Sequence, residues 1–265
     1  MGLDTYGGGV LLVLSSAILA VIGLLITRKV IDLERLRSSH DVGGYLLSVV
    51  GTLYAVLLGL VVVDAMSKFS LAREVTEREA NCLADVYVLA QCLPEKKRDE
   101  VRTICVNYAS AVIDTEWDDM DEGAYCPVAH KTAVDLMQSL MNFEPVSENQ
   151  KALFPLMVAD AGDMWKARRQ RINMALNGVD NAEWFTLIVG GAITIFFTFF
   201  FGLENLKLQI AMTAMVAVLI SLNVYLVALF GYPFSGDMKI GTDSFRIDQG
   251  IFDNRVGLRT GAGIH

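Results

Sequence analysis

The stretch that decides the fold is GTLYAVLLGLVVVDAMSKFSLAREVTEREA, residues 51–80. Its first half is apolar and its second half is dense in charged side chains, yet no glycine or proline lies between Gly59 and Pro94. Because nothing in this sequence breaks a helix, we expect one helix of about 50 residues, roughly 75 Å long. Its apolar section continues directly into a polar one, as in a helix that leaves a membrane and enters an aqueous domain.

The composition supports a membrane protein. The chain has 265 residues, of which 53% are hydrophobic and 20% charged, and its mean hydropathy is +0.43. Four apolar runs contain no Asp, Glu, Lys, Arg or His, at residues 8–26, 42–63, 184–203 and 208–232. Each is long enough to cross about 30 Å of hydrocarbon as a helix. Since backbone groups in lipid must bond internally, all four runs are predicted helices.

A cleaved signal peptide is the alternative for the first run. The residues before it include Asp4 but no Lys or Arg, so the basic segment that opens a signal peptide is missing. We therefore expect the first run to be retained as a membrane helix.

The four runs divide the chain into membrane and extramembrane segments. Residues 1–63 are predicted to form a first transmembrane hairpin, 64–183 a helical extramembrane domain, 184–232 a second hairpin and 233–265 a glycine-rich tail. Segment 64–183 holds 13 Lys and Arg against 21 Asp and Glu, which accounts for the whole net charge of −8. Such an acidic surface argues against nucleic-acid binding. The predicted fold class is all-α: a polytopic membrane protein with four transmembrane helices and an extramembrane antiparallel helical bundle.

Helical periodicity continues through the extramembrane domain. Apolar positions at steps of three and four predict helices over residues 95–117, 127–143 and 147–176, the last opened by a capping box at Ser147 and Gln150. The long helix carries its own stripe, made of Ala72, Val75, Glu79, Cys82, Val86, Leu89 and Leu93. A stripe of this kind needs neighbouring helices to cover it, so an antiparallel bundle follows.

Two membrane runs carry strips of small side chains. The strip of the second run is Ser48, Gly51, Ala55 and Gly59, and that of the third run is Gly190, Thr194, Thr198 and Gly202. Small residues let helix backbones approach closely in lipid. The strips predict either packing of the two runs against each other within one chain, which is the simpler interpretation, or packing between subunits around a pore.

Two charged stretches are candidate ligand sites. The basic stretch KARRQR supplies candidates for contact with an anion or a lipid headgroup: Lys166, Arg168, Arg169 and Arg171. The acidic stretch WDDMDEG supplies candidate ligands for a cation: Asp118, Asp119, Asp121 and Glu122. It lacks the spacing of an EF-hand loop, so no metal site is assigned. The simpler interpretations are a helix face paired with carboxylates and a solvated turn.

The sequence contains no recognisable catalytic motif. The GxxxxGK[ST], HExxH, CxxC and GxSxG patterns are all missing, and the three histidines are scattered. We therefore expect no enzyme. The membrane runs hold no ionisable side chain, which also argues against a proton-coupled pump.

The four cysteines all lie in the predicted extramembrane domain, at Cys82, Cys92, Cys105 and Cys126. Disulfides among them would indicate an oxidising compartment. Free thiols would instead be small residues on helix stripes. The sequence leaves both alternatives open.

The distribution of basic residues bears on the side of the membrane that the domain occupies. The loop at residues 27–41 carries Arg28, Lys29, Arg35 and Arg37, whereas the N-terminus has no basic side chain. Short loops count most in the positive-inside rule, so the loop is predicted to be cytoplasmic and the domain periplasmic or extracellular, in a bacterial inner membrane. Counting every flank of the four runs reverses the result.

Four short motifs resemble a known family. They are GxxYAVLLG at Gly51–Gly59, ExEA at Glu77–Ala80, EW at Glu116–Trp117 and PFSG at Pro233–Gly236. In this order they resemble the bacterial membrane family described as a bestrophin-like domain of unknown function, over about residues 42 to 245.

The chain is more distantly similar to true bestrophins, which are pentameric, calcium-regulated anion channels with four spans and a large cytosolic helical domain. Their NPFG motif precedes acidic residues that clasp calcium. Here Tyr232 replaces the Asn, Ser235 separates Phe from Gly, and the following acidic residues are sparse, with Asp237 and Asp243 as the candidate cation ligands. This departure argues against a calcium clasp. The resemblance also implies a cytosolic domain, opposite to the prediction from the first loop.

These observations predict a homo-oligomeric membrane channel of bestrophin-like type. Its partners would be the lipid bilayer, further copies of the chain and permeating ions, with no cofactor and calcium suggested only by the resemblance. The alternative is a membrane-anchored scaffold or sensor whose acidic helical domain binds a partner protein.

Overall fold

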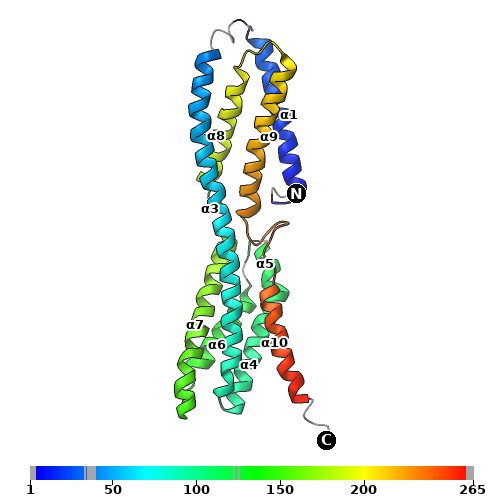
Figure 1. The fold of residues 1–265 in the computed structure, drawn as a ribbon. Helices are drawn as coiled ribbons and strands as arrows, with labels where there is room; N and C mark the ends of the chain where they lie inside the picture. Colours follow the sequence, from blue (N-terminus) through cyan, green and yellow to red (C-terminus); the bar gives the residue numbers. More distant parts are fainter. Residues whose placement is uncertain (1–3, 33, 35–39, 122, 125, 261–265) are drawn as a thin grey trace. The chain divides into compact units, whose positions relative to one another are not determined.

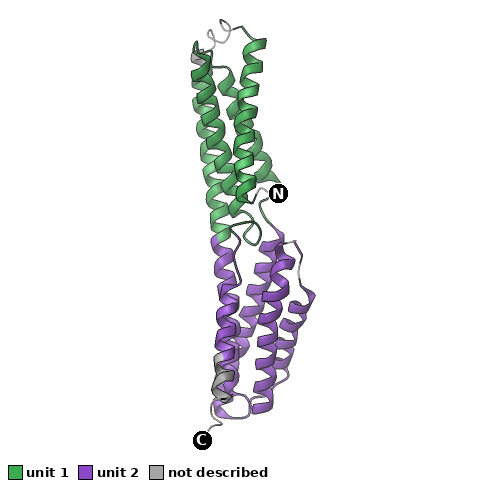
Figure 2. Ribbon diagram, turned by 90° about the vertical axis from the view of Figure 1, so that its right-hand side faces the viewer, with its two compact units in different colours: residues 1–69, 178–238 green, residues 70–177, 239–265 purple. Residues whose placement is uncertain are grey.

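The computed structural model describes residues 4–32, 34, 40–121, 123–124 and 126–260, with side chains described for all of these except 40–42 and 254–260. The regular elements in this part of the chain are helices (Figure 1), which confirms the all-α fold class. They form two compact units. Unit 1 contains residues 1–69 and 178–238, and unit 2 contains residues 70–177 and 239–265 (Figure 2).

Unit 1 is built from the membrane-length helices. These are α1 (Tyr6–Val30), the first part of α3 (His40–Leu89), α8 (Asn181–Phe199) and α9 (Leu206–Phe230). Each of the four is long and apolar enough to cross a bilayer, as predicted. Helix α1 packs against α8 and α9, and α8 also packs against α9.

The third span ends earlier than its hydrophobicity predicts. Helix α8 stops at Phe199, and residues 200–205 form a loop. The Asn205 side chain then caps α9 by accepting a hydrogen bond from Leu208 N at 3.2 Å. The prediction that Gly202 extends the small-residue strip of α8 is therefore wrong, because this glycine lies buried in the loop. Hydropathy alone does not distinguish an apolar loop from the end of an apolar helix.

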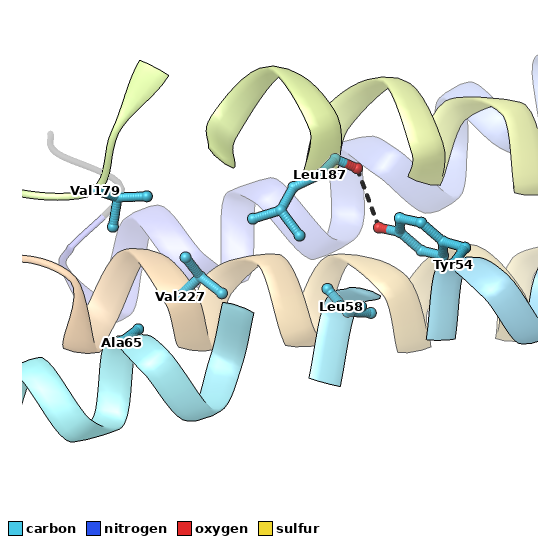
Figure 3. Close-up of a cluster of buried hydrophobic side chains, with 6 residues drawn as sticks. All are labelled: Tyr54, Leu58, Ala65, Val179, Leu187 and Val227. Carbon is cyan, nitrogen blue, oxygen red and sulfur yellow. Dashed lines mark hydrogen bonds between the residues drawn. The ribbon is translucent and has the colours of Figure 1, made fainter. Parts of the chain in front are cut away.

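Aromatic rings pack onto glycines in unit 1. Tyr54 of α3 is 8% exposed, and its hydroxyl donates a hydrogen bond to Leu187 O of α8 at 3.1 Å (Figure 3). The ring fits because Gly190 lacks a side chain: a Cβ there would lie 2.5 Å from Tyr54 Cδ2. Two further contacts of this kind join α1 to its neighbours, Tyr225 with Gly9 and Phe199 with Gly23.

Unit 2 contains the rest of α3 and a set of shorter helices. They are α4 (Glu95–Ala111), α5 (Trp117–Asp121), α6 (Pro127–Met141), α7 (Glu148–Leu176) and α10 (Asp243–Thr260). A 3-10 turn, η1 (Ala90–Cys92), follows α3, and a π turn, η2 (Val112–Glu116), joins α4 to α5. Helix α7 opens with the predicted capping box, in which Ser147 Oγ accepts from Gln150 N at 3.2 Å.

The predicted long helix is confirmed. Helix α3 contains 50 residues without interruption, which corresponds to roughly 75 Å at the usual rise per residue. Its residues 40–69 belong to unit 1 and its residues 70–89 to unit 2. The change from apolar to charged sequence within residues 51–80 therefore occurs inside one helix.

The C-terminal segment differs from the predicted glycine-rich tail. Residues 243–260 form α10, and Phe245 and Phe252 are buried in unit 2. Tyr87 of α3 stacks on Phe252, with ring centroids 4.3 Å apart. A spacing of seven residues between two phenylalanines is a helical repeat, but the glycines around it obscured the pattern. The units also differ from the predicted segments in that residues 64–69 and 178–183 belong with the spans.

Candidate functional site

The small-residue strip of α3 faces away from the other described helices of unit 1. Ser48, Ala55 and Gly59 are exposed and Gly51 is partly so. A methyl group added at Gly51 or Gly59 would meet no atom within 4 Å. The Ser48 hydroxyl donates to Gly44 O at 3.0 Å, so its hydrogen is already used. The described part of unit 1 thus leaves a narrow, uncharged face of α3 uncovered.

The strip of α8 faces inward instead. Thr194 and Thr198 are buried, and Gly190 lies under the Tyr54 ring. The expectation that the two strips pack against each other within one chain is therefore wrong. The face of α3 that meets α8 carries Tyr54 and Leu58, next to the strip rather than on it (Figure 3). A large ring on α3 fills the space that small residues on α8 leave.

Unit 2 contains a buried cluster of four charged side chains, which we call the charge cluster: Glu79 of α3, Glu116 of η2, and Arg168 and Arg171 of α7. Arg171 forms a two-pronged pair with Glu79, at 2.7 Å from Nε to Oε2 and 2.8 Å from Nη2 to Oε1. Its Nη2 also lies 2.6 Å from Glu116 Oε1. Arg168 Nη2 bonds the other oxygen of Glu116. Two cations thus neutralise two carboxylates.

The π turn explains how Glu116 reaches this cluster. A π turn inserts an extra residue into a helix and rotates the residues after it relative to those before it. Here η2 lies between α4 and α5, and both Val112 and Glu116 at its ends are buried. Such turns are frequent at functional sites.

Aromatic and polar neighbours complete the shell around Arg171. Its guanidinium carbon lies 5.0 Å from the centre of the Trp117 ring, and Trp117 Nε1 donates to Ile240 O at 2.9 Å. The Tyr108 hydroxyl donates to Glu79. Burial raises the pKa of Tyr108 well above its usual range, and the Glu79 charge raises it further, so the phenol stays a neutral donor.

Burial by itself lowers the pKa of Arg171, but the charge and hydrogen bonds of Glu79 and the charge of Glu116 raise it above its ordinary value. The side chain therefore stays charged although it is fully buried. Removing one partner from a buried ion pair leaves an uncompensated charge, which is far more costly than losing a surface pair. The cluster fixes α3, η2 and α7 in one arrangement.

The basic residues of the KARRQR stretch thus separate into two pairs. Arg168 and Arg171 are buried in the charge cluster, where Glu79 and Glu116 pair with them. Arg169 and Lys166 are exposed, and Lys166 pairs with Asp163 at 2.8 Å. Helical spacing of three residues between the two buried arginines was the available signal.

The candidate cation ligands do not come together. Among the described residues, no group of three or more His, Cys, Asp or Glu side chains could hold a metal ion. Asp121 pairs with Lys239 at 2.7 Å, Asp118 and Asp243 are exposed, and Asp119 is partly so. Glu122 lies outside the described residues.

Asp237 has a different role from the one considered for it. Its Oδ2 accepts a hydrogen bond from Tyr6 N at 2.6 Å, at the start of α1. Ser235 Oγ bonds Asp4 Oδ2 at 3.0 Å, and Gly236 adopts a φ of +74° against the Asp4 backbone. The PFSG motif therefore holds the segment before α1, and its glycine is required there because other residues rarely adopt this φ.

Two buried groups in unit 2 stay outside the charge cluster. Asp248 of α10 is 3% exposed, and its Oδ2 has no hydrogen-bond partner within the described residues. Burial raises the pKa of Asp248 to about 7, and the Asp85 charge adds to this. The cysteines are free thiols, and burial raises the pKa of Cys105 to about 12.

A model of the bestrophin-like domain matches residues 14–245. The chain belongs to the bestrophin-like family. A crystal structure of a bacterial bestrophin homologue from Klebsiella pneumoniae, phased with zinc, has a TM-score of 0.67 at 12% identity, over 91% of the bestrophin-like chain and 97% of its own. A variant of that homologue has a TM-score of 0.66 at 13% identity, over 91% and 98%. The comparison with curated proteins gave no match.

A third solved structure, of a membrane protein variant, has a TM-score of 0.69 at 11% identity, over 91% of the bestrophin-like chain and 97% of that protein. At such low identities these structures support the fold alone. Within that fold, two of the motifs that carried the resemblance meet at one place. ExEA supplies Glu79 and EW supplies Glu116 to the charge cluster, together with Trp117 beside Arg171.

Proposed function

We propose that the bestrophin-like chain assembles as a homo-oligomeric ion channel in a bacterial inner membrane, with the small-residue strip of α3 lining or framing the pore. One observation carries the proposal: this face of α3 suits close helix contact, yet the described helices of unit 1 leave it uncovered. Symmetric copies would bring equivalent strips together around an axis. Family membership and the similar fold support the same assembly.

The chemistry of the strip sets what kind of pore it can form. It carries no charged side chain, and the hydroxyls of Ser48 and of Thr52, which is next to Gly51 of the strip, donate to backbone carbonyls of their own helix. Ion passage along it would depend on pore width and on hydroxyl and backbone dipoles rather than on rings of fixed charge. Such a pore requires neither a cofactor nor a catalytic group.

Single-channel recording of the purified chain in planar bilayers tests the proposal. We expect discrete currents, and we expect a cationic methanethiosulfonate reagent to change the conductance of Ala55→Cys severalfold. Leu53→Cys, which is exposed on another face of α3, should be unaffected. The wild type, which keeps the same native cysteines, is the second control. No flux under anion and cation gradients, with calcium varied, would contradict a channel and favour the scaffold alternative.

The orientation is part of the proposal. The first loop favours a periplasmic unit 2, whereas the resemblance to bestrophins implies a cytosolic one. Val146, in the loop between α6 and α7, is 80% exposed, so Val146→Cys provides a reporter on unit 2. Labelling by a membrane-impermeant maleimide in spheroplasts would support the periplasmic orientation. Labelling only after the membrane is opened would contradict it.

A further inference from the structure

A groove in unit 2 lies beside the charge cluster and has no assigned role. It has a volume of about 670 Å³ and is lined by α7 and one residue of α6. Six of its side chains are polar, namely His130, Lys166, Arg168, Arg169, Gln170 and Asn173. We call it the α7 groove. Its volume lies in the range of small-molecule sites, roughly 300–1,000 Å³.

The lining of the α7 groove has one sign of charge. It includes three cationic side chains and no carboxylate, although the chain as a whole has a net charge of −8. Arg169 is exposed and forms no ion pair within the described part of the chain. Lys166 pairs with Asp163 at 2.8 Å, but both side chains are more than half exposed. Exposed pairs of this kind are weak and readily exchange partners.

One of the residues that line the groove has a buried donor that is left unused. Arg168 is 3% exposed, and one end of its guanidinium bonds Glu116. Its Nε is buried and has no hydrogen-bond partner among the described residues. A buried donor without an acceptor is costly, so an unpaired guanidinium N–H next to a polar groove points to an acceptor that arrives with a ligand.

The donors favour one class of ligand. A guanidinium edge, an ammonium group and two carboxamides can donate to several oxygens at once, and arginine matches phosphate and carboxylate geometry best. The negative end of the helix dipole acts only within the last turn of α7. That turn lines one end of the groove through Asn173 and Leu176, whereas Arg168 lies two turns earlier. A polyoxyanion satisfies more of these donors than a halide ion does.

We propose that the α7 groove binds a phosphate group, presented by a soluble phosphate monoester or by an anionic lipid headgroup. Arg169 and Lys166 attract the group electrostatically, and Arg168 Nε donates to one of its oxygens. Both sources share this chemistry. A headgroup is a candidate because the membrane helix α8 begins at Asn181, soon after α7 ends in the sequence.

Calorimetric titration of the full chain in phosphatidylcholine nanodiscs tests the proposal, with inorganic phosphate and glycerol 3-phosphate as probes. We expect saturable binding at one site per chain. Arg169→Glu should weaken it at least tenfold, because it reverses an exposed charge that supports no other contact in the described structure. The matched control is Lys151→Glu, the same kind of charge reversal elsewhere on α7, which should change the affinity less than twofold.

A second variant addresses the buried donor. Arg168→Lys keeps the charge near Glu116 but removes Nε, so it should weaken phosphate binding at least fivefold if its unfolding temperature shows that unit 2 stays folded. Should this variant unfold, Lys166→Ala combined with Arg169→Ala provides the same test on exposed positions. Absence of saturable phosphate binding, or equal affinities for the wild type and Arg169→Glu, would overturn the proposal.

The two sources are separated by repeating the titration in nanodiscs that contain phosphatidylglycerol. If the lipid headgroup occupies the groove, it should compete with glycerol 3-phosphate and weaken the apparent binding of this probe. The control variant Lys151→Glu should show the same weakening. An unchanged affinity supports a soluble phosphate monoester. The experiment depends on the groove alone, so it is independent of whether the chain conducts ions.

Discussion

Unit 1 buries aromatic rings against glycines, whereas unit 2 buries arginines against carboxylates. Tyr54 lies on Gly190 with its hydroxyl bonded to a backbone carbonyl, and Arg171 lies between Glu79 and Glu116 with every charge matched. Where side chains are described, the ion pairs whose partners are both fully buried belong to unit 2. Each kind of packing suits its surroundings. In lipid there is no hydrophobic force between helices, so close packing decides how the helices associate. A helical bundle in water can also bury paired charges in its core.

The largest expected effect breaks the charge cluster. Arg171→Met leaves two buried carboxylates with only Arg168 to neutralise them, which should cost about 3–5 kcal/mol of unfolding free energy. Denaturant titration monitored by fluorescence reports this directly, because Trp117 stacks beneath Arg171. Arg169→Met is the control, since an exposed substitution should change stability by no more than about 0.5 kcal/mol. Equal losses in both variants would show that the cluster has no special role.

The next effect concerns the glycine contacts of unit 1. Gly190→Ala places a methyl group against the Tyr54 ring and should cost about 1–3 kcal/mol, as overpacking does elsewhere. Gly59→Ala, on the uncovered strip, should be neutral or slightly stabilising in the dispersed chain. Thermal unfolding in detergent compares them. Adding Tyr54→Leu should restore part of the stability that Gly190→Ala loses, because the smaller side chain leaves room for the methyl group. Strictly additive effects of the two substitutions on stability would contradict a contact between these residues.

A smaller effect depends on pH. Asp248 has a raised pKa of about 7 in the folded chain, so the folded state binds a proton that the unfolded state releases near pH 4. Stability therefore falls as the pH rises, by about 1.4 kcal/mol between pH 6 and pH 8. Below the unfolded pKa both states are protonated and the dependence vanishes. The charge of Asp85 of α3 adds to the raised pKa of Asp248, and the charge of Asp248 in turn raises the pKa of Cys105 of α4.

Asp248→Asn separates this effect from other pH responses. The variant should not lose stability between pH 6 and pH 8. Limited proteolysis of α10 measures this loss in the variant and in the wild type at each pH. Because the two proteins are compared under identical conditions, changes in protease activity cancel. A wild-type and a variant chain with the same pH dependence would assign the response to other groups.

The smallest expected effect compares two serines. Ser147→Ala removes the cap of α7 and should cost about 1 kcal/mol, seen as faster hydrogen exchange in the first turn of that helix. Ser48→Ala, in the membrane, removes only a hydroxyl bonded to its own helix at Gly44 O and should leave stability unchanged. If the two serines behaved alike, the cap would not be what holds the start of α7.

The long apolar runs and the uninterrupted α3 were predictable because hydropathy and the absence of helix breakers are local properties. The direction that each small-residue strip faces was not predictable. Periodicity shows that residues share a face of a helix but does not show what that face contacts. Tyr54, adjacent to the strip, took the position opposite Gly190. The charge cluster joins residues far apart in sequence, and no local pattern pairs Glu79 with Arg171. Glu79 was also recognisable as the one charged residue on the stripe of the long helix, whereas only a short family motif singled out Glu116.

The π turn that ends at Glu116 behaves as one surplus residue in an otherwise regular helix. If all of these residues were kept but wound as an ordinary α-helix, without the π turn, everything downstream would shift by about 100° around the axis. Glu116 would swing out of the core while Trp117 and α5 rotated with it. The arrangement of the buried acids is therefore encoded in a count of residues as well as in their identity, and a gap in the wrong place would be as damaging as a changed side chain.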